Sequence, residues 1–138
     1  MNETGILNAD IAGALACMGH MDECMVVDAG FPIPDGPKRI DLAISENQPT
    51  VMAIIEELKK HFSVEKIVLA QETKDFSPSR FDEVVEQFSD AELEVIPHTE
   101  LKKRSKSSKF IIRTGDFTAC SNVLLVSGGG PRWYVENA

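Results

Sequence analysis

Cysteine, tryptophan and tyrosine are all scarce in this sequence. Of its 138 residues, three are cysteine, one is tryptophan and one is tyrosine. Cys17, Cys24 and Cys120 are odd in number, and no two of them have the spacing of a metal site or a redox motif. We interpret them as reduced thiols. Because disulfides persist mainly in oxidising compartments, reduced thiols predict an intracellular protein.

Basic residues are also few, and long apolar runs are absent. The chain has 14 Lys and Arg residues against 22 Asp and Glu, which gives a formal net charge of −8. Nucleic acids and anionic membranes both require a basic face, so the charge argues against either partner. No apolar run approaches the roughly 20 residues of a membrane helix, and no signal peptide is recognisable at the N-terminus. We expect a cytoplasmic protein.

The composition is otherwise that of a folded domain. Hydrophobic residues make up 43 % of the chain and charged residues 26 %, which is typical of globular proteins. A chain of this length can bury a core without disulfides or metals. We expect one domain over residues 1–138, with 128–138 as a C-terminal tail. The glycines that begin this tail do not form a phosphate-binding loop, because Pro131 follows them instead of a helix with Lys-Ser/Thr.

Helical and strand patterns alternate along the chain. Apolar residues at helical spacing predict three helices, over 9–18 with Asn8 as its cap, 49–62 with Pro49 in its first turn, and 77–88 with Ser77-Pro78 as its cap. Short apolar runs predict strands at 23–28, 39–44, 64–70, 92–96, 110–113 and 122–127. This alternation predicts a single three-layer α/β domain with a largely parallel sheet flanked by helices. Segment 31–37 is predicted to be an irregular loop, and the basic segment 102–109 a solvated loop or helix end.

Polar residues follow several of the predicted strands, where sites form in α/β sheets. Asp28 ends the first strand, Gln71 and Glu72 follow the 64–70 strand, and His98 follows the 92–96 strand. His20 lies just before the first strand. We predict that these residues converge on one cleft.

Each candidate has a structural alternative. His20 is suited to proton transfer near neutral pH, but it could instead cap the preceding helix. Asp28 could be a turn former, although a carboxylate at the end of an apolar strand needs a partner or a substrate. His98 could cap the following helix.

Other kinds of site have no motif here. There is no His-x-x-x-His or Cys-x-x-Cys pair for a transition metal and no Gly-x-Ser-x-Gly elbow for a serine nucleophile. Cys24 lies inside a predicted buried strand, which disfavours a reactive thiolate. We therefore expect neither a metal nor a cofactor.

Several of these segments occur together and in the same order in one known family. From about residue 5 to residue 127, the sequence resembles the D-ribose pyranase family. The Gly-His-x-Asp motif and the Asp-Ala-Gly-x-Pro-Ile-Pro motif are the most specific matches. The segments that carry the resemblance are Gly19-His20-x-Asp22, Asp28-Ala29-Gly30-Phe31-Pro32-Ile33-Pro34, Arg39-Ile40-Asp41-Leu42-Ala43, Ala70-Gln71-Glu72-x-Lys74, Pro97-His98 and Arg113-Thr114-Gly115-Asp116.

This resemblance implies an activity and a set of site residues. The activity is interconversion of the pyranose and furanose rings of free D-ribose, with exchange of anomers and no cofactor. His20 would be the catalytic proton donor, and Asp28 and His98 would bind the sugar. Asp28 could orient His20 or hold a sugar hydroxyl. The family's substrate-binding segment, usually Tyr-x-Asn, is matched by Asn122, but Cys120 stands in the place of the tyrosine.

The cysteine at this position leaves alternatives open. Because a thiol offers neither a ring face nor a hydroxyl, either the substrate preference has shifted or another aromatic residue compensates, with Trp133 and Tyr134 of the tail as candidates. The alternatives to a D-ribose enzyme are a mutarotase for L-fucose or another monosaccharide, a non-catalytic sugar-binding protein, and an unrelated structural α/β domain. The resemblance also implies a ring-shaped homo-oligomer, commonly decameric, with active sites at subunit contacts.

Overall fold

Six strands form one mixed sheet in the computed structural model, which describes residues 1–137. Their order across the sheet is β2-β5-β1-β6-β3-β4. The pairs β2–β5, β5–β1 and β3–β4 are parallel, whereas β6 runs antiparallel to both β1 and β3. The strands are β1 (Glu23–Val27), β2 (Lys38–Asp41), β3 (Val64–Ala70), β4 (Glu92–Ile96), β5 (Phe110–Arg113) and β6 (Val123–Ser127).

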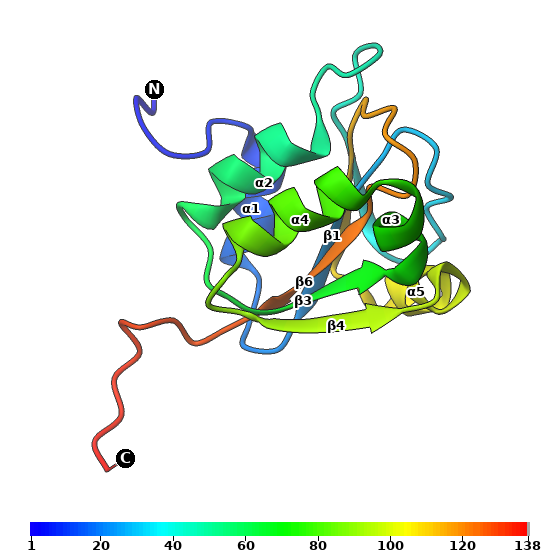
Figure 1. Cartoon of the computed structure of the whole chain (residues 1–138). Helices are drawn as coiled ribbons and strands as arrows, with labels where there is room; N and C mark the ends of the chain where they lie inside the picture. The colour runs from blue at the N-terminus through cyan, green and yellow to red at the C-terminus, as the bar shows by residue number, and fades with distance from the viewer. Residues whose placement is uncertain (138) are drawn as a thin grey trace.

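Helices cover both faces of this sheet. In Figure 1, α1, α2 and α4 lie together on one face and α5 lies on the other, which gives the predicted three layers. Within residues 1–137, no helix has the length and apolar character that crossing a membrane requires. The helices are α1 (Ala9–Ala16), α2 (Val51–Lys59), α3 (Gln71–Phe76), α4 (Pro78–Gln87) and α5 (His98–Arg104), which continues into a 3-10 turn at Ser105–Ser107.

The helix ends confirm one predicted cap and correct two. The Asn8 side chain accepts a hydrogen bond from Ile11 N, as an N-cap residue should. Thr50, and not Pro49, is next to the first turn of α2, and its side chain accepts from Ala53 N. Ser77 lies at the N-cap of α4, but its hydroxyl donates to the Ala119 carbonyl instead of capping the helix.

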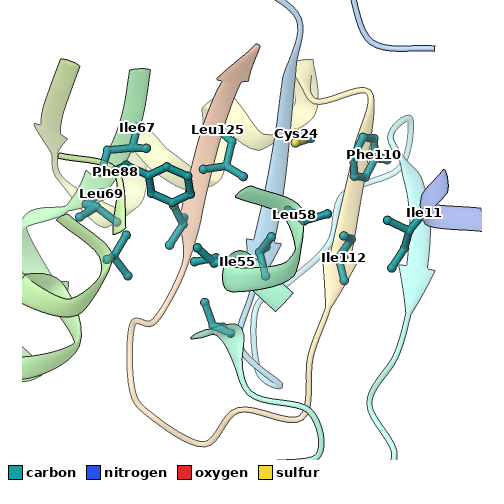
Figure 2. Packing of buried hydrophobic residues seen from close by; sticks show 14 of the residues in the cluster. Ile11, Cys24, Ile55, Leu58, Ile67, Leu69, Phe88, Phe110, Ile112 and Leu125 are labelled. Carbon is teal, nitrogen blue, oxygen red and sulfur yellow. The ribbon is translucent and has the colours of Figure 1, made fainter. Parts of the chain in front are cut away.

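Buried side chains alternate between the two faces of each strand. Residues of one parity, such as Cys24 and Val26 in β1, pack against α1, α2 and α4 in the cluster drawn in Figure 2. Residues of the other parity, such as Met25 and Val27, pack against Phe31 and α5 on the opposite face. Every residue of β6 is buried, which is expected for a strand in the middle of a three-layer fold.

The strands predicted at 110–113 and 122–127 are both interior strands of the sheet: β5 lies between β2 and β1, and β6 lies between β1 and β3. The segment 102–109 contains a helix end, one of its two predicted alternatives, since α5 ends at Arg104 and a 3-10 turn follows. It is not wholly solvated, because Ser105 and Ser108 are buried within it. Its Arg104 guanidinium bridges the carboxylates of Glu94 and Glu23.

Candidate active site

Three of the predicted site residues meet where β1 ends and β6 begins. Asp28 directly follows β1, and Asn122 directly precedes β6. The antiparallel pairing of these strands brings the two residues side by side, and Asp28 N donates to Asn122 Oδ1 at 2.9 Å. His98 begins α5 on the adjacent face, and its Nε2 lies 3.2 Å from Asn122 Nδ2. Asn122 thus connects Asp28 to His98.

The Asp28 carboxylate is held by backbone amides. Its Oδ1 accepts from Gly30 N at 3.1 Å and its Oδ2 accepts from Ser121 N at 3.2 Å. Burial raises the pKa of this carboxyl above its ordinary value, and the hydrogen bonds from Gly30 and Ser121 only partly oppose that effect. A half-buried carboxylate with free lone pairs is suited to accept hydrogen bonds from sugar hydroxyls.

The His98 ring is oriented from several directions. Its backbone N donates to Glu72 Oε2 at 2.7 Å, and its ring packs edge-on against Phe31. Burial lowers the pKa of His98, and the nearby cation of Lys102 lowers it further. In the neutral ring Nε2 can accept from the Asn122 amide, which leaves the proton on Nδ1 as a donor.

An open pocket lies beside Asp28. Its volume is about 460 Å³, and one side is formed by the residues that follow β1 while the other is formed by the connection between β5 and β6. This size falls within the range of small-molecule sites. The lining residues are Asp28, Ala29, Gly30, Arg113, Phe117, Thr118 and Ala119.

Cys120 lies in the same connection, in a left-handed backbone conformation with φ +56°. The Thr73 hydroxyl donates to its carbonyl and holds this turn in place. Burial and the negative charges of Asp28 and Glu72 raise the pKa of the Cys120 thiol. The thiol is therefore protonated near neutral pH and is not a nucleophile.

His20 does not join this cluster within one chain, which corrects the prediction of a single cleft. It lies just before β1, whereas Asp28 lies just after it, and five residues of strand separate the two ends by roughly 16 Å. The His20 side chain is 54 % exposed, and its Nε2 lies 2.8 Å from Glu65 Oε2 at the start of β3. Asp28 therefore does not orient His20 in the same chain; Glu65 contacts it instead.

The C-terminal tail lies at the His20 end as well. It continues from β6, and Figure 1 shows it leaving the sheet far from the β5–β6 connection that carries Cys120. Trp133 and Tyr134 are 70 % and 85 % exposed. Compensation for Cys120 by these aromatics within the same chain is therefore ruled out. Ala138, the last residue of the predicted tail, lies outside the described residues.

Several residues that organise the site were missed from the sequence. Glu72 was among the residues predicted to converge on the cleft and does bond to His98, whereas Glu65, Thr73 and Arg80 carried no motif at all. Each contacts a site residue or its loop across 26 to 47 positions of sequence. No local pattern encodes such pairs. Among residues 1–137, no group of three or more His, Cys, Asp and Glu side chains is arranged to hold a metal ion.

Comparison with known proteins matches this sequence and fold to one family. Residues 1–129 match the model of the RbsD / FucU transport protein family. The chain belongs to this family. It is 43 % identical to a D-ribose pyranase of Limosilactobacillus fermentum over 128 residues, and 44 % identical to one of Kosmotoga olearia over 129 residues. Each alignment covers 93 % of this chain and 98 % of the relative.

Solved structures of RbsD / FucU proteins agree with the fold. Bacillus subtilis RbsD complexed with D-ribose superposes with a TM-score of 0.90 at 37 % identity, covering 93 % of this chain and 98 % of that one. A fucose mutarotase from Streptococcus pneumoniae, in complex with L-fucose, has a TM-score of 0.72 at 17 % identity, covering 88 % of this chain and 93 % of that one. The second likeness shows the shared fold alone.

The pKa shift of His98 predicts how sugar affinity varies with pH. Because the pKa of His98 lies below the ordinary 6.5, the ring stays neutral at pH 7 and keeps its bond with Asn122. Acidification through this lowered pKa adds a proton to Nε2, which removes that acceptor. We expect D-ribose affinity to fall by about tenfold or less over this range, as for loss of one hydrogen bond. Calorimetric titration from pH 8 to pH 5 measures it, and His98→Gln, which cannot titrate, should show no such fall.

Proposed function

We propose that this protein is a D-ribose pyranase, an isomerase that interconverts the pyranose and furanose rings of free D-ribose. The observation that carries the proposal is the Asp28–Asn122–His98 cluster beside a pocket of monosaccharide size. It occurs in a chain that is 43 % identical to a D-ribose pyranase over nearly its whole length. The three unpaired cysteines support a reducing, cytoplasmic location.

The reaction needs positioned proton donors and acceptors. Ring opening removes a proton from the anomeric hydroxyl and delivers one to the ring oxygen, and reclosure through a different hydroxyl changes the ring size. Asp28 can accept from a sugar hydroxyl, and His98 can donate through Nδ1. Asn122 bonds to both residues, and Cys120 directly follows Ala119, which lines the pocket. We assign proton delivery to His20, because an imidazole exchanges protons readily near neutral pH.

This assignment requires a second copy of the chain. The strand β1, about 16 Å long, separates His20 from Asp28 in the same chain, too far for both to touch one pentose. A sugar bound at Asp28 would therefore receive its proton from His20 of a neighbouring copy. We propose a homo-oligomer in which the His20 end of one chain meets the Asp28 end of the next. Such head-to-tail contacts form a ring when the rotation between neighbours closes, and the family resemblance implies a decameric ring.

The Glu65 carboxylate is the natural partner of the proposed proton donor. At 2.8 Å from His20 Nε2, it can orient the ring and stabilise the imidazolium that forms when a proton is taken up. We expect Glu65→Gln to lower kcat by about tenfold or more, as for loss of a charge-assisted hydrogen bond, with little change in ribose affinity.

A matched control for Glu65 exists on α2. Glu57 also contacts a histidine, since its Oε1 lies 3.4 Å from His61 Nε2, but neither residue of this pair bonds to His20, Glu65 or Asp28. Glu57→Gln should leave kcat unchanged. If Glu65→Gln retains the full kcat of the wild-type protein, Glu65 does not support proton transfer by His20.

Ring exchange measured by magnetisation-transfer NMR tests the proposed function directly. The protein should accelerate pyranose–furanose exchange of D-ribose, and L-fucose serves as the comparison sugar. Acceleration of fucose alone would assign the protein to L-fucose. Binding of ribose without acceleration would make it a sugar-binding protein and overturn the proposed activity.

A further inference from the structure

The connection between β5 and β6 carries two proposed sugar-binding residues, Cys120 and Asn122. A buried ion pair, between Arg80 of α4 and Asp116 of the connection, holds this connection in place. We infer that Arg80 and Asp116 form a positioning unit that keeps this connection in the conformation that binds the sugar. The inference rests on the proposed function, because it concerns the same site. Neither residue lines the pocket: Arg80 bonds to Ser121, and Asp116 holds Arg80 in place.

Arg80 reaches the connection from α4. Its Nη1 donates to Asp116 Oδ2 at 2.6 Å and to the Ser121 hydroxyl, and its Nη2 lies 3.4 Å from the Thr118 hydroxyl. The Arg80 side chain is only 14 % exposed and that of Asp116 is fully buried. One guanidinium therefore bonds to three positions of the connection.

Asp116 links this arginine to the rest of the fold. Its Oδ2 also accepts from Val51 N, at the first turn of α2, and its Oδ1 accepts from Thr118 N, both at 2.8 Å. Burial alone would raise the pKa of Asp116, but the bonds from Thr118, Val51 and Arg80 hold it below the ordinary value. The carboxylate is therefore charged at neutral pH, and Arg80 is the cation that balances it.

Ser121 connects the Arg80–Asp116 ion pair to the site. Its hydroxyl accepts from Arg80, while its backbone N donates to Asp28 Oδ2 at 3.2 Å. The next residue is Asn122, which bonds to both Asp28 and His98. If Ser121 moves, Asp28 loses one of its amide donors. Asn122, the next residue, then shifts relative to Asp28 and His98.

The chemistry of arginine is needed for this role. Its planar guanidinium presents several N–H donors in a rigid fork, so one side chain can serve Asp116, Ser121 and Thr118 together. The ammonium of lysine is a compact point charge and cannot reproduce that geometry. Arg80→Lys should therefore keep the ion pair with Asp116 but lose the bond that Nη2 makes to Thr118.

Variants at both positions test the inference in the full-length protein. Arg80→Gln combined with Asp116→Asn removes both charges together, which avoids an unpaired buried charge. We expect this double variant to fold and to bind D-ribose about ten- to a hundred-fold more weakly, with a raised KM, because misplaced site groups lose affinity steeply. Arg80→Lys should show a smaller increase of the same kind.

The control is Glu83→Gln. Glu83 is the exposed partner of Arg80 on α4, with its Oε2 at 3.2 Å from Nε, and it makes no bond to the connection. Its loss should leave the ribose KM unchanged. The inference is overturned if the double variant has a lower Tm but a ribose KM within about twofold of the control, since Arg80 would then support only the fold.

A structural measurement separates this inference from the proposed function. The side-chain amide resonances of Asn122 should shift in the double variant and stay unchanged in Glu83→Gln. If the wild-type protein neither binds nor turns over D-ribose, the proposed function fails, and these resonances still decide whether Arg80 positions Asn122. Unchanged Asn122 resonances in the double variant would overturn the positioning role.

Discussion

Mixing His20→Ala chains with Asp28→Asn chains should restore ribose ring exchange that neither variant performs alone. Each single variant should lose most of the acid–base acceleration, roughly a hundred- to ten-thousand-fold. Because the two residues lie at opposite ends of β1, a site that uses both draws them from different chains. Random co-assembly of equal amounts should complete about one quarter of such shared sites. Magnetisation-transfer NMR after joint dissociation and reassembly measures the recovered rate.

A second mixture provides the control. Asp28 and Asn122 lie at the same end of the chain, joined by the bond from Asp28 N to Asn122 Oδ1. Mixing Asp28→Asn with Asn122→Ala should therefore recover nothing, because every site contains one of the two defects. Native mass spectrometry confirms that the chains have mixed. Mixed oligomers of the His20 and Asp28 variants without any recovered exchange would refute a shared site.

Replacement of Asp116 by alanine should have the largest effect on stability. It leaves the mostly buried Arg80 without its counter-ion and removes the acceptor of Val51 N. Loss of one partner of a buried ion pair costs about 3–5 kcal/mol. Urea unfolding at pH 7 should show this loss for Asp116→Ala. Asp82→Ala, at an exposed position of α4, should change the free energy of unfolding by about 0.5 kcal/mol or less.

The same carboxylate predicts a pH dependence of stability. The pKa of Asp116 is lower in the folded protein than its ordinary value of 3.8. Its contribution is therefore fully present above about pH 4 and is lost as the pH falls through the folded-state pKa. The gap in unfolding free energy between wild type and Asp116→Asn should be widest near neutral pH and should narrow below pH 4. A constant gap down to pH 2 would contradict a depressed pKa.

The order of helices and strands could be predicted from the sequence because it depends on local spacing of apolar residues. The predicted 64–70 and 92–96 strands coincide with β3 and β4. Boundaries were less accurate at helix ends, where α1 stops at Ala16 and α2 begins after Thr50. The short helix α3 was missed because its six residues directly follow β3 and lack an apolar stripe.

The sequence by itself determined the three-layer class, the buried strands and, through its motifs, the family and the residues Asp28, His98 and Asn122. Only the tertiary structure decided which of the candidates meet. Periodicity tells which side of a strand is buried but not which strand lies beside it. The antiparallel insertion of β6 beside β1 brings Asn122 to Asp28 and leaves His20 at the other end with Glu65. The His20–Glu65 and Asp28–Asn122 contacts join residues that are 45 and 94 positions apart in the sequence. Both contacts depend on that topology, so local sequence could not reveal them.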